Sequence, residues 1–103
     1  MMRTEQRIYK DIADTVTVYV PSGWKKIIIV AKIESDNGET TYDYIDESGA
    51  QRWFVPDTHN QYQVYLAFQE LRSLMSTTNN LWNTACFSID RSDAFHIKFD
   101  YEI

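Results

Sequence analysis

Apolar side chains recur along the first twenty residues with the period of a helix. Ile8, Ile12, Val16 and Tyr19 are spaced three and four apart, and charged side chains occupy the positions between them. This spacing predicts a helix over residues 4–19. The β-branched residues from Thr15 to Val20 weaken its last turn. Pro21-Ser22-Gly23 then ends the element.

The same period returns in the second half and predicts a longer helix over residues 58–76. Pro56-Asp57-Thr58 opens it, and Thr58 and Gln61 have the spacing of a capping box. Its apolar stripe, which we expect to pack on a sheet, consists of Val64, Phe68, Leu71, Leu74 and Met75.

Short runs rich in β-branched and aromatic residues, bounded by turn signals, predict five strands, over residues 26–34, 40–46, 50–55, 84–90 and 94–103. In the last of them Phe95, Ile97 and Phe99 alternate with charged residues and should face the core. In the first, Ile28 and Val30 make the second face apolar as well, which predicts a central strand covered on both sides. Asp36-Asn37-Gly38 and Glu47-Ser48-Gly49 mark the turns between the first three strands.

The resulting element order is α-β-β-β-α-β-β. This order favours an α+β fold, an antiparallel sheet of about five strands with two helices packed on one face. A chain of 103 residues has the usual size of one domain, so we expect residues 1–103 to form a single domain.

Charge and composition narrow the class of function. Lys and Arg number 10 against 15 Asp and Glu, which gives a net charge of −5. An acidic surface repels phosphate backbones, so nucleic-acid binding is disfavoured. Cys86 is the only cysteine, which suits a reducing compartment. No apolar run approaches the length of a membrane span. We therefore expect a soluble cytoplasmic protein without a membrane partner.

The residues that usually carry catalysis are sparse. His59 and His96 have no nucleophile motif near them, and Cys86 has no neighbouring cation that would activate its thiol. The ligand sets of a metal site and the glycine-rich loop of a phosphate site are both missing. The sequence thus predicts no enzyme, no metal and no cofactor. A small hydrolase that uses His96 and Asp100, which share a strand face, is a minor alternative.

A hairpin rich in acids and aromatics is the strongest candidate for a binding site. Between residues 34 and 51 there are six acids and no base. Tyrosine and tryptophan, which are enriched in binding hot spots, lie among them. The alternative is an edge hairpin that charge keeps soluble. The candidate partner-binding residues are Glu34, Asp36, Glu39, Tyr42, Asp43, Tyr44, Asp46, Glu47 and Trp53.

Several segments together carry a family resemblance. They are Gly23-Trp24-Lys25-Lys26-Ile27, Leu81-Trp82-Asn83-Thr84, Phe87-Ser88-Ile89-Asp90 and the closing Phe95 to Glu102. With the amphipathic first helix, they resemble the YezG-like antitoxin and immunity family of bacterial polymorphic toxin systems. The resemblance implies a small acidic cytosolic α+β protein that neutralises a cognate toxin, often a nuclease.

The chain departs from the family pattern in two places. Ser92-Asp93-Ala94 stands where the family often has a glycine before the last strand, and residues 36–60 match only in outline. The second segment is where an immunity protein would diversify to fit its own toxin.

Our hypothesis is an immunity protein that binds a cognate toxin domain and blocks its active site or substrate cleft, with contact-dependent growth inhibition as one setting in which the toxin would arrive. The alternative is a generic acidic protein-interaction or regulatory domain without a toxin partner. The sequence leaves the oligomeric state open.

Overall fold

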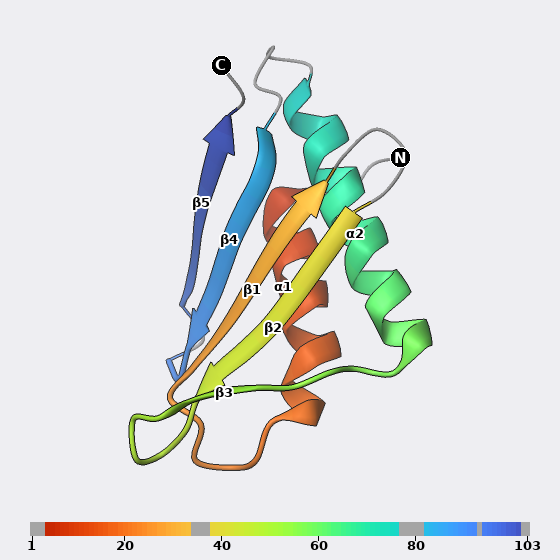
Figure 1. Cartoon of the computed structure of the whole chain (residues 1–103). Coiled ribbons are helices and arrows are strands. Elements are labelled where there is room, and N and C mark those ends of the chain that lie inside the picture. The colour runs from red at the N-terminus through yellow and green to blue at the C-terminus, as the bar shows by residue number, and fades with distance from the viewer. Residues whose placement is uncertain (1–3, 34–37, 77–81, 93, 102–103) are drawn as a thin grey trace.

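The computed structural model describes residues 4–33, 38–76, 82–92 and 94–101. In chain order the elements are α1 (Glu5–Val16), the short 3-10 helix η1 (Thr17–Tyr19), β1 (Lys26–Ile33), β2 (Gly38–Ile45), β3 (Gln51–Trp53), α2 (Thr58–Ser76), β4 (Trp82–Asp90) and β5 (Phe95–Tyr101). The strands form one antiparallel sheet in the order β3-β2-β1-β4-β5. Both helices lie behind this sheet in Figure 1, so the α+β prediction is confirmed.

The central strand β1 is covered on one face only. Ile27, Ile29 and Ala31 are fully buried towards the helices, as their alternation predicts. Ile28 and Val30 lie on the other face and are only partly buried. The prediction that β1 is covered on both sides was therefore wrong. An antiparallel sheet can leave one face to solvent, and here both helices cover the same face.

The first helix ends earlier than its apolar period suggests. The Thr4 hydroxyl caps it by accepting a hydrogen bond from the Arg7 backbone N–H at 3.2 Å. After Val16 the chain tightens into η1, where Thr17 and Val18 continue a β-branched run. Such side chains lose rotamer freedom in an α-helix, which explains the change of geometry at this point.

The second helix begins with a cap that the sequence pattern misassigned. The Asp57 carboxylate, rather than Thr58, accepts the Asn60 backbone N–H at 2.9 Å. The Gln61 side chain donates instead to the Pro56 carbonyl at 2.7 Å. The Tyr19 hydroxyl also donates to Asp57 at 2.9 Å. The end of the first helical segment is thus tied to the start of α2.

The core fills the space between the sheet and the two helices. Phe87 at its centre contacts the rings of Tyr9, Phe68 and Phe95, with centroids 5.6 to 6.3 Å apart. Ala85, Phe87 and Ile89 of β4 are buried, as predicted. Phe95, Ile97 and Phe99 of β5 are partly buried and pack against this core.

Candidate partner-binding surface

The side chains considered for catalysis do not come together. His59 and Cys86 are exposed on different elements. His96 is exposed too, and its ring nitrogen lies 3.6 Å from Asp90. The side chain of Asp100 lies outside the described residues. Within the described part of the chain, no three His, Cys, Asp or Glu side chains gather as a metal site requires.

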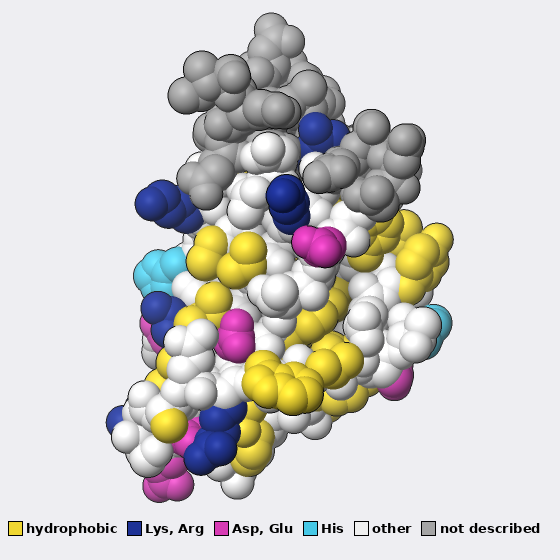
Figure 2. All heavy atoms as spheres, in the orientation of Figure 1, with side chains coloured by type: hydrophobic (Ala, Val, Ile, Leu, Met, Phe, Trp, Pro, Cys, Tyr) yellow, Lys and Arg dark blue, Asp and Glu magenta, His cyan; other side chains and the backbone are white. Residues whose placement is uncertain are grey.

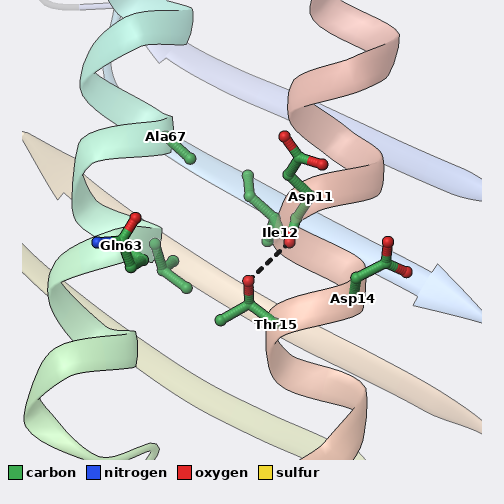
Figure 3. Close-up of a pocket in the computed structure, with 7 residues that line it drawn as sticks. Asp11, Ile12, Asp14, Thr15, Gln63 and Ala67 are labelled. Carbon is green, nitrogen blue, oxygen red and sulfur yellow. Dashed lines mark hydrogen bonds between the residues drawn. The ribbon is translucent and has the colours of Figure 1, made fainter.

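A furrow of about 280 Å³ runs between α1 and α2, and Figure 3 shows the residues that line it. Its acidic side chains are Asp11 and Asp14, both from α1. Arg7 pairs with Asp11 at 3.4 Å, and Lys10 pairs with Asp14 at 3.2 Å. The Thr15 hydroxyl donates to the Asp11 carbonyl at 2.8 Å. These groups are satisfied within one helix, so the furrow is better explained by helix packing than by ligand binding.

The nine residues predicted to bind a partner are spread over several environments. Glu34 and Asp36 lie outside the described residues. Glu39, Asp43 and Trp53 are on the open face of the sheet, where Asp43 is directly opposite Trp53 in the β2–β3 register. We call the two carboxylates of this group, Glu39 and Asp43, the acidic margin.

The two tyrosines of β2 point to the helix side instead. Tyr42 is only 6% exposed, and Tyr44 is half-buried. Both rings contact Phe54, with centroids 5.5 and 6.0 Å away. Most of each ring therefore packs beneath the sheet rather than on its open surface.

Asp46 is bound within the β2–β3 turn. Its carboxylate accepts hydrogen bonds from the backbone N–H groups of Ser48 and Ala50 and from the Ser48 hydroxyl, at 2.6 to 3.0 Å. It also pairs with Arg52 at 2.6 Å. These bonds, led by the one from the Ser48 side chain, hold the pKa of Asp46 well below its usual range. Glu47 is exposed in the same turn, next to Gly23.

The β4–β5 turn repeats this arrangement. Asp90 accepts hydrogen bonds from Ser92 and from the Ala94 backbone N–H, and these bonds lower its pKa. The signal was visible in the sequence as the repeated spacing Asp-x-Ser-x-Ala, at Asp46 to Ala50 and at Asp90 to Ala94. In both turns a basic side chain six residues after the aspartate, Arg52 or His96, lies near its carboxylate.

Charge is distributed unevenly across the open face of the sheet. The register places Asp43, Ile28, Ser88 and His96 side by side from β2 to β5. The next row runs from Thr41 through Val30 and Cys86 to Lys98. Along these two rows the face carries Asp43 on β2, apolar side chains on β1, and His96 and Lys98 on β5. Figure 2 looks onto this face and shows hydrophobic side chains with charged ones around them.

Exposed apolar side chains lie on β3, just after it and on α2, and the sequence analysis singled out only Trp53 among them. Trp53 is 76% exposed, and Val55, Tyr62 and Leu66 are exposed as well. Val55 follows β3, while Tyr62 and Leu66 share one face of α2. The spacing of apolar residues along the sequence shows only which helix or strand each of these residues belongs to. It does not show that two elements bring them together.

Comparison with known proteins identifies the family. Residues 6–103 match the model of the YezG-like immunity proteins. The chain belongs to the YezG-like immunity protein family. Family membership supports an immunity or antitoxin role, exercised on a protein partner.

Two relatives of this YezG-like chain have curated names. One is the type VII secretion system protein EsaG of Staphylococcus aureus, 23% identical over 108 residues. The other is the immunity protein YezG of Bacillus spizizenii, 25% identical over 109 residues. The alignments cover 92% of this chain but only 66% and 67% of the relatives. The chain therefore spans about two thirds of the length of these relatives.

Neither described helix combines the length and apolar composition that a membrane crossing requires.

Among the residues that the structure describes, the surface offers the acidic margin and the apolar side chains beside it as its most distinctive feature.

Proposed function

We propose that this chain is a cytoplasmic immunity protein that neutralises a cognate toxin domain by binding it. The observation that carries the proposal is the family match over residues 6–103. The open sheet face supports it, because an uncovered face with an apolar centre is typical of a surface that binds another protein. The mechanism is inhibition by occupation of the toxin surface, without chemistry on the toxin.

The acidic margin suggests the kind of toxin. A nuclease draws its substrate into a cleft lined with basic side chains, because these contact the phosphates. Glu39 and Asp43 present carboxylates on the open face, and the whole chain carries a net charge of −5. Carboxylates placed in such a cleft occupy the positions of phosphates and exclude the substrate. A nuclease toxin is therefore the partner that this charge favours.

The route by which the toxin arrives is a separate matter. Contact-dependent growth inhibition would deliver it from a neighbouring cell. The name of the Staphylococcus aureus relative refers to a type VII secretion system, which favours a toxin exported by that machinery. Either route leaves the immunity protein with the same task in the cytoplasm.

Co-expression tests the proposal. A candidate toxin domain, chosen from the proteins that are encoded next to this chain, is expressed in a host cell with and without the chain, and growth is scored. We expect growth arrest with the toxin alone and rescue when both are present, together with a complex that co-purifies. Absence of both rescue and binding would contradict the proposal. A catalytically inactive toxin domain controls for the burden of expression.

A further inference from the structure

One edge of the sheet is left unpaired within the described part of the chain. β3 pairs only with Asp43–Ile45, the last residues of β2. The Phe54 backbone N–H adds one more bond, to the Tyr42 carbonyl at 3.1 Å. Beyond it the chain leaves the sheet and runs to the start of α2, as Figure 1 shows. Gly38 to Thr41 thus form a free strand edge.

The regular geometry of a strand determines which N–H and C=O groups of β2 point away from β1 at this edge. The Tyr42 carbonyl points away from β1, towards Phe54. Hydrogen-bonding groups of an antiparallel strand alternate between its two neighbours. Thr40, two residues earlier, therefore directs its N–H and C=O to the open side. An unpaired edge of this kind is a template for another strand.

A cavity of about 410 Å³ lies along the same edge. Its lining includes Thr41 and Asp43 from the open face of β2, and Thr40 and Tyr42 from the helix face. A cavity that touches both faces of one strand lies beside its edge, where a neighbouring strand would run. Exposed Trp53 and Val55, together with Gln61 of α2, complete its wall. We call this cavity the edge groove.

Tyr42, which lines the groove, also carries a hydroxyl that the described protein leaves unsatisfied. It is buried and has no hydrogen-bond partner. Tyr42 also lines an adjoining cavity of about 260 Å³, between β2 and Tyr62 of α2. Burial raises the pKa of Tyr42 to about 12, an effect that the Thr40 side chain offsets in part without reaching hydrogen-bond geometry. A buried hydroxyl without a partner is costly, and an incoming carbonyl would satisfy it.

We propose that the edge groove receives an extended segment of the toxin, which adds to the sheet as a strand beside Gly38–Thr41. This inference rests on the proposed function and assigns its binding site. Backbone hydrogen bonds to Thr40 supply affinity, and an apolar side chain between Trp53 and Val55 supplies specificity, as in other cases of strand addition. Asp43 favours a segment that carries lysine or arginine.

The charges on β2 argue against a second copy of this chain as the occupant. If two β2 edges paired antiparallel about Thr41, Glu39 of one copy would lie opposite Asp43 of the other. Like charges directly opposite each other destabilise a strand pair. A register centred on Thr40 would avoid this contact, but a basic segment is attracted by the same carboxylates in every register, so the charges on β2 favour a cationic partner over a second copy.

The first test removes the backbone donor. Thr40→Pro deletes the outward N–H but leaves the bonds to β1, since edge strands accept proline where the N–H faces outward. Thr40→Val keeps the N–H and is the matched control. Affinity is measured by calorimetry with the catalytically inactive toxin domain encoded beside this chain, after circular dichroism has shown both variants to be folded. We expect Thr40→Pro to bind about tenfold or more weakly, and Thr40→Val to bind like wild type.

The second test removes a side chain from the wall of the groove. It introduces no proline, so the backbone of β2 is unchanged. Trp53→Ala is compared with Val18→Ala on η1, because both native side chains are 76% exposed and only Trp53 lines the groove. We expect about tenfold weaker toxin binding for Trp53→Ala, a size typical of an aromatic hot spot, and no change for Val18→Ala.

The outcomes separate this inference from the proposed function. If wild type binds the toxin and folded Thr40→Pro and Trp53→Ala bind equally well, strand addition is wrong and the immunity role stands. If wild type does not bind at all, the proposed function itself fails. Wild type that sediments as a dimer, while Thr40→Pro sediments as a monomer, would identify a second copy as the occupant and overturn the proposal.

Discussion

Three aspartates hold local structure by accepting backbone N–H groups. Asp46 and Asp90 close the two hairpin turns, and Asp57 caps α2. Each carboxylate has a lowered pKa because hydrogen bonds favour its charged form. The acids that the sequence suggests as one charged surface therefore fall into two groups. Some carboxylates are bound within turns and helix caps, and the others can contact a partner.

The Asp46 turn gives stability a dependence on pH. Because the folded-state pKa of Asp46 lies below the ordinary value of 3.8, its carboxylate stabilises the fold fully above that value, and this contribution is lost progressively as the pH falls from there towards the lower folded-state pKa. In the Asp46→Asn variant, the side chain at this position carries no titratable group. We expect the variant to be less stable than wild type at pH 7, with the gap narrowing from about pH 5 to pH 3. Urea unfolding at each pH measures the gap, and a constant gap would contradict this assignment.

Tyr42 should show opposite effects on stability and on binding. Because its hydroxyl is buried without a partner, Tyr42→Phe removes an unsatisfied group and keeps the ring against Phe54. We expect the free energy of unfolding to stay the same or rise by up to about 1 kcal/mol, while affinity for the toxin falls. Urea unfolding and calorimetry on one preparation measure both quantities. A clear loss of stability would show that the hydroxyl is satisfied in the free protein.

At the scale of elements, the structure centres the core on β4 rather than on β5, although the inward-facing residues of both strands were predicted to face the core. Phe87 of β4 is fully buried, with three rings around it, whereas Phe99 of the edge strand β5 is partly buried. Alternation marks both positions as inward-facing. It does not show that a central strand lies deeper than an edge strand.

Substitution of the two phenylalanines tests this ranking. Phe87→Ala should cost about 3–5 kcal/mol, because it removes buried apolar surface and leaves a cavity. Phe99→Ala should cost less, since part of its ring already contacts water. Equilibrium unfolding in urea measures both values. An equal or larger loss for Phe99→Ala would place the centre of the core at β5.

At the scale of the whole molecule, the charges that the rows of the open face carry differ between the β2 and β5 sides. Asp43 lies on the β2 side of the open face, and Lys98 lies on the β5 side. A basic partner should therefore be steered to the β2 edge over about 8 Å, the screening length at physiological salt. Asp46 is unsuitable for testing this, because its reversal would break a turn.

Reversal of the charge at Asp43 tests this electrostatic steering of a basic partner. Asp43→Lys should slow association with the toxin domain by about tenfold at low salt and flatten its salt dependence, with a smaller effect on dissociation. Asp14→Lys on α1 changes the net charge equally on the opposite side of the molecule and is the control. Stopped-flow mixing at several salt concentrations measures the rates. Equal slowing by both variants would assign the effect to net charge rather than to the acidic margin.

The sequence by itself determined the architecture. Periods of two and of three to four locate the strands and helices within a few residues, because burial on one face of an element imposes the period of that element. It also indicated the immunity family, through segments that form α1, β1, β4 and β5. The misassigned helix cap shows the limit of local patterns: Asp57 and Thr58 are both good caps, and the tertiary contact with Tyr19 favours Asp57.

Only the tertiary structure decided which acids and aromatics can meet a partner. Tyr42 and Asp43 are adjacent in sequence but lie on opposite faces of β2, and Asp46 is held by its turn. Val55 and Tyr62, which the sequence does not connect with the hairpin, border the cavities along the free edge of β2. Exposure and pairing depend on where the chain leaves β3 and where α2 packs. These are contacts between distant segments, which no local period records.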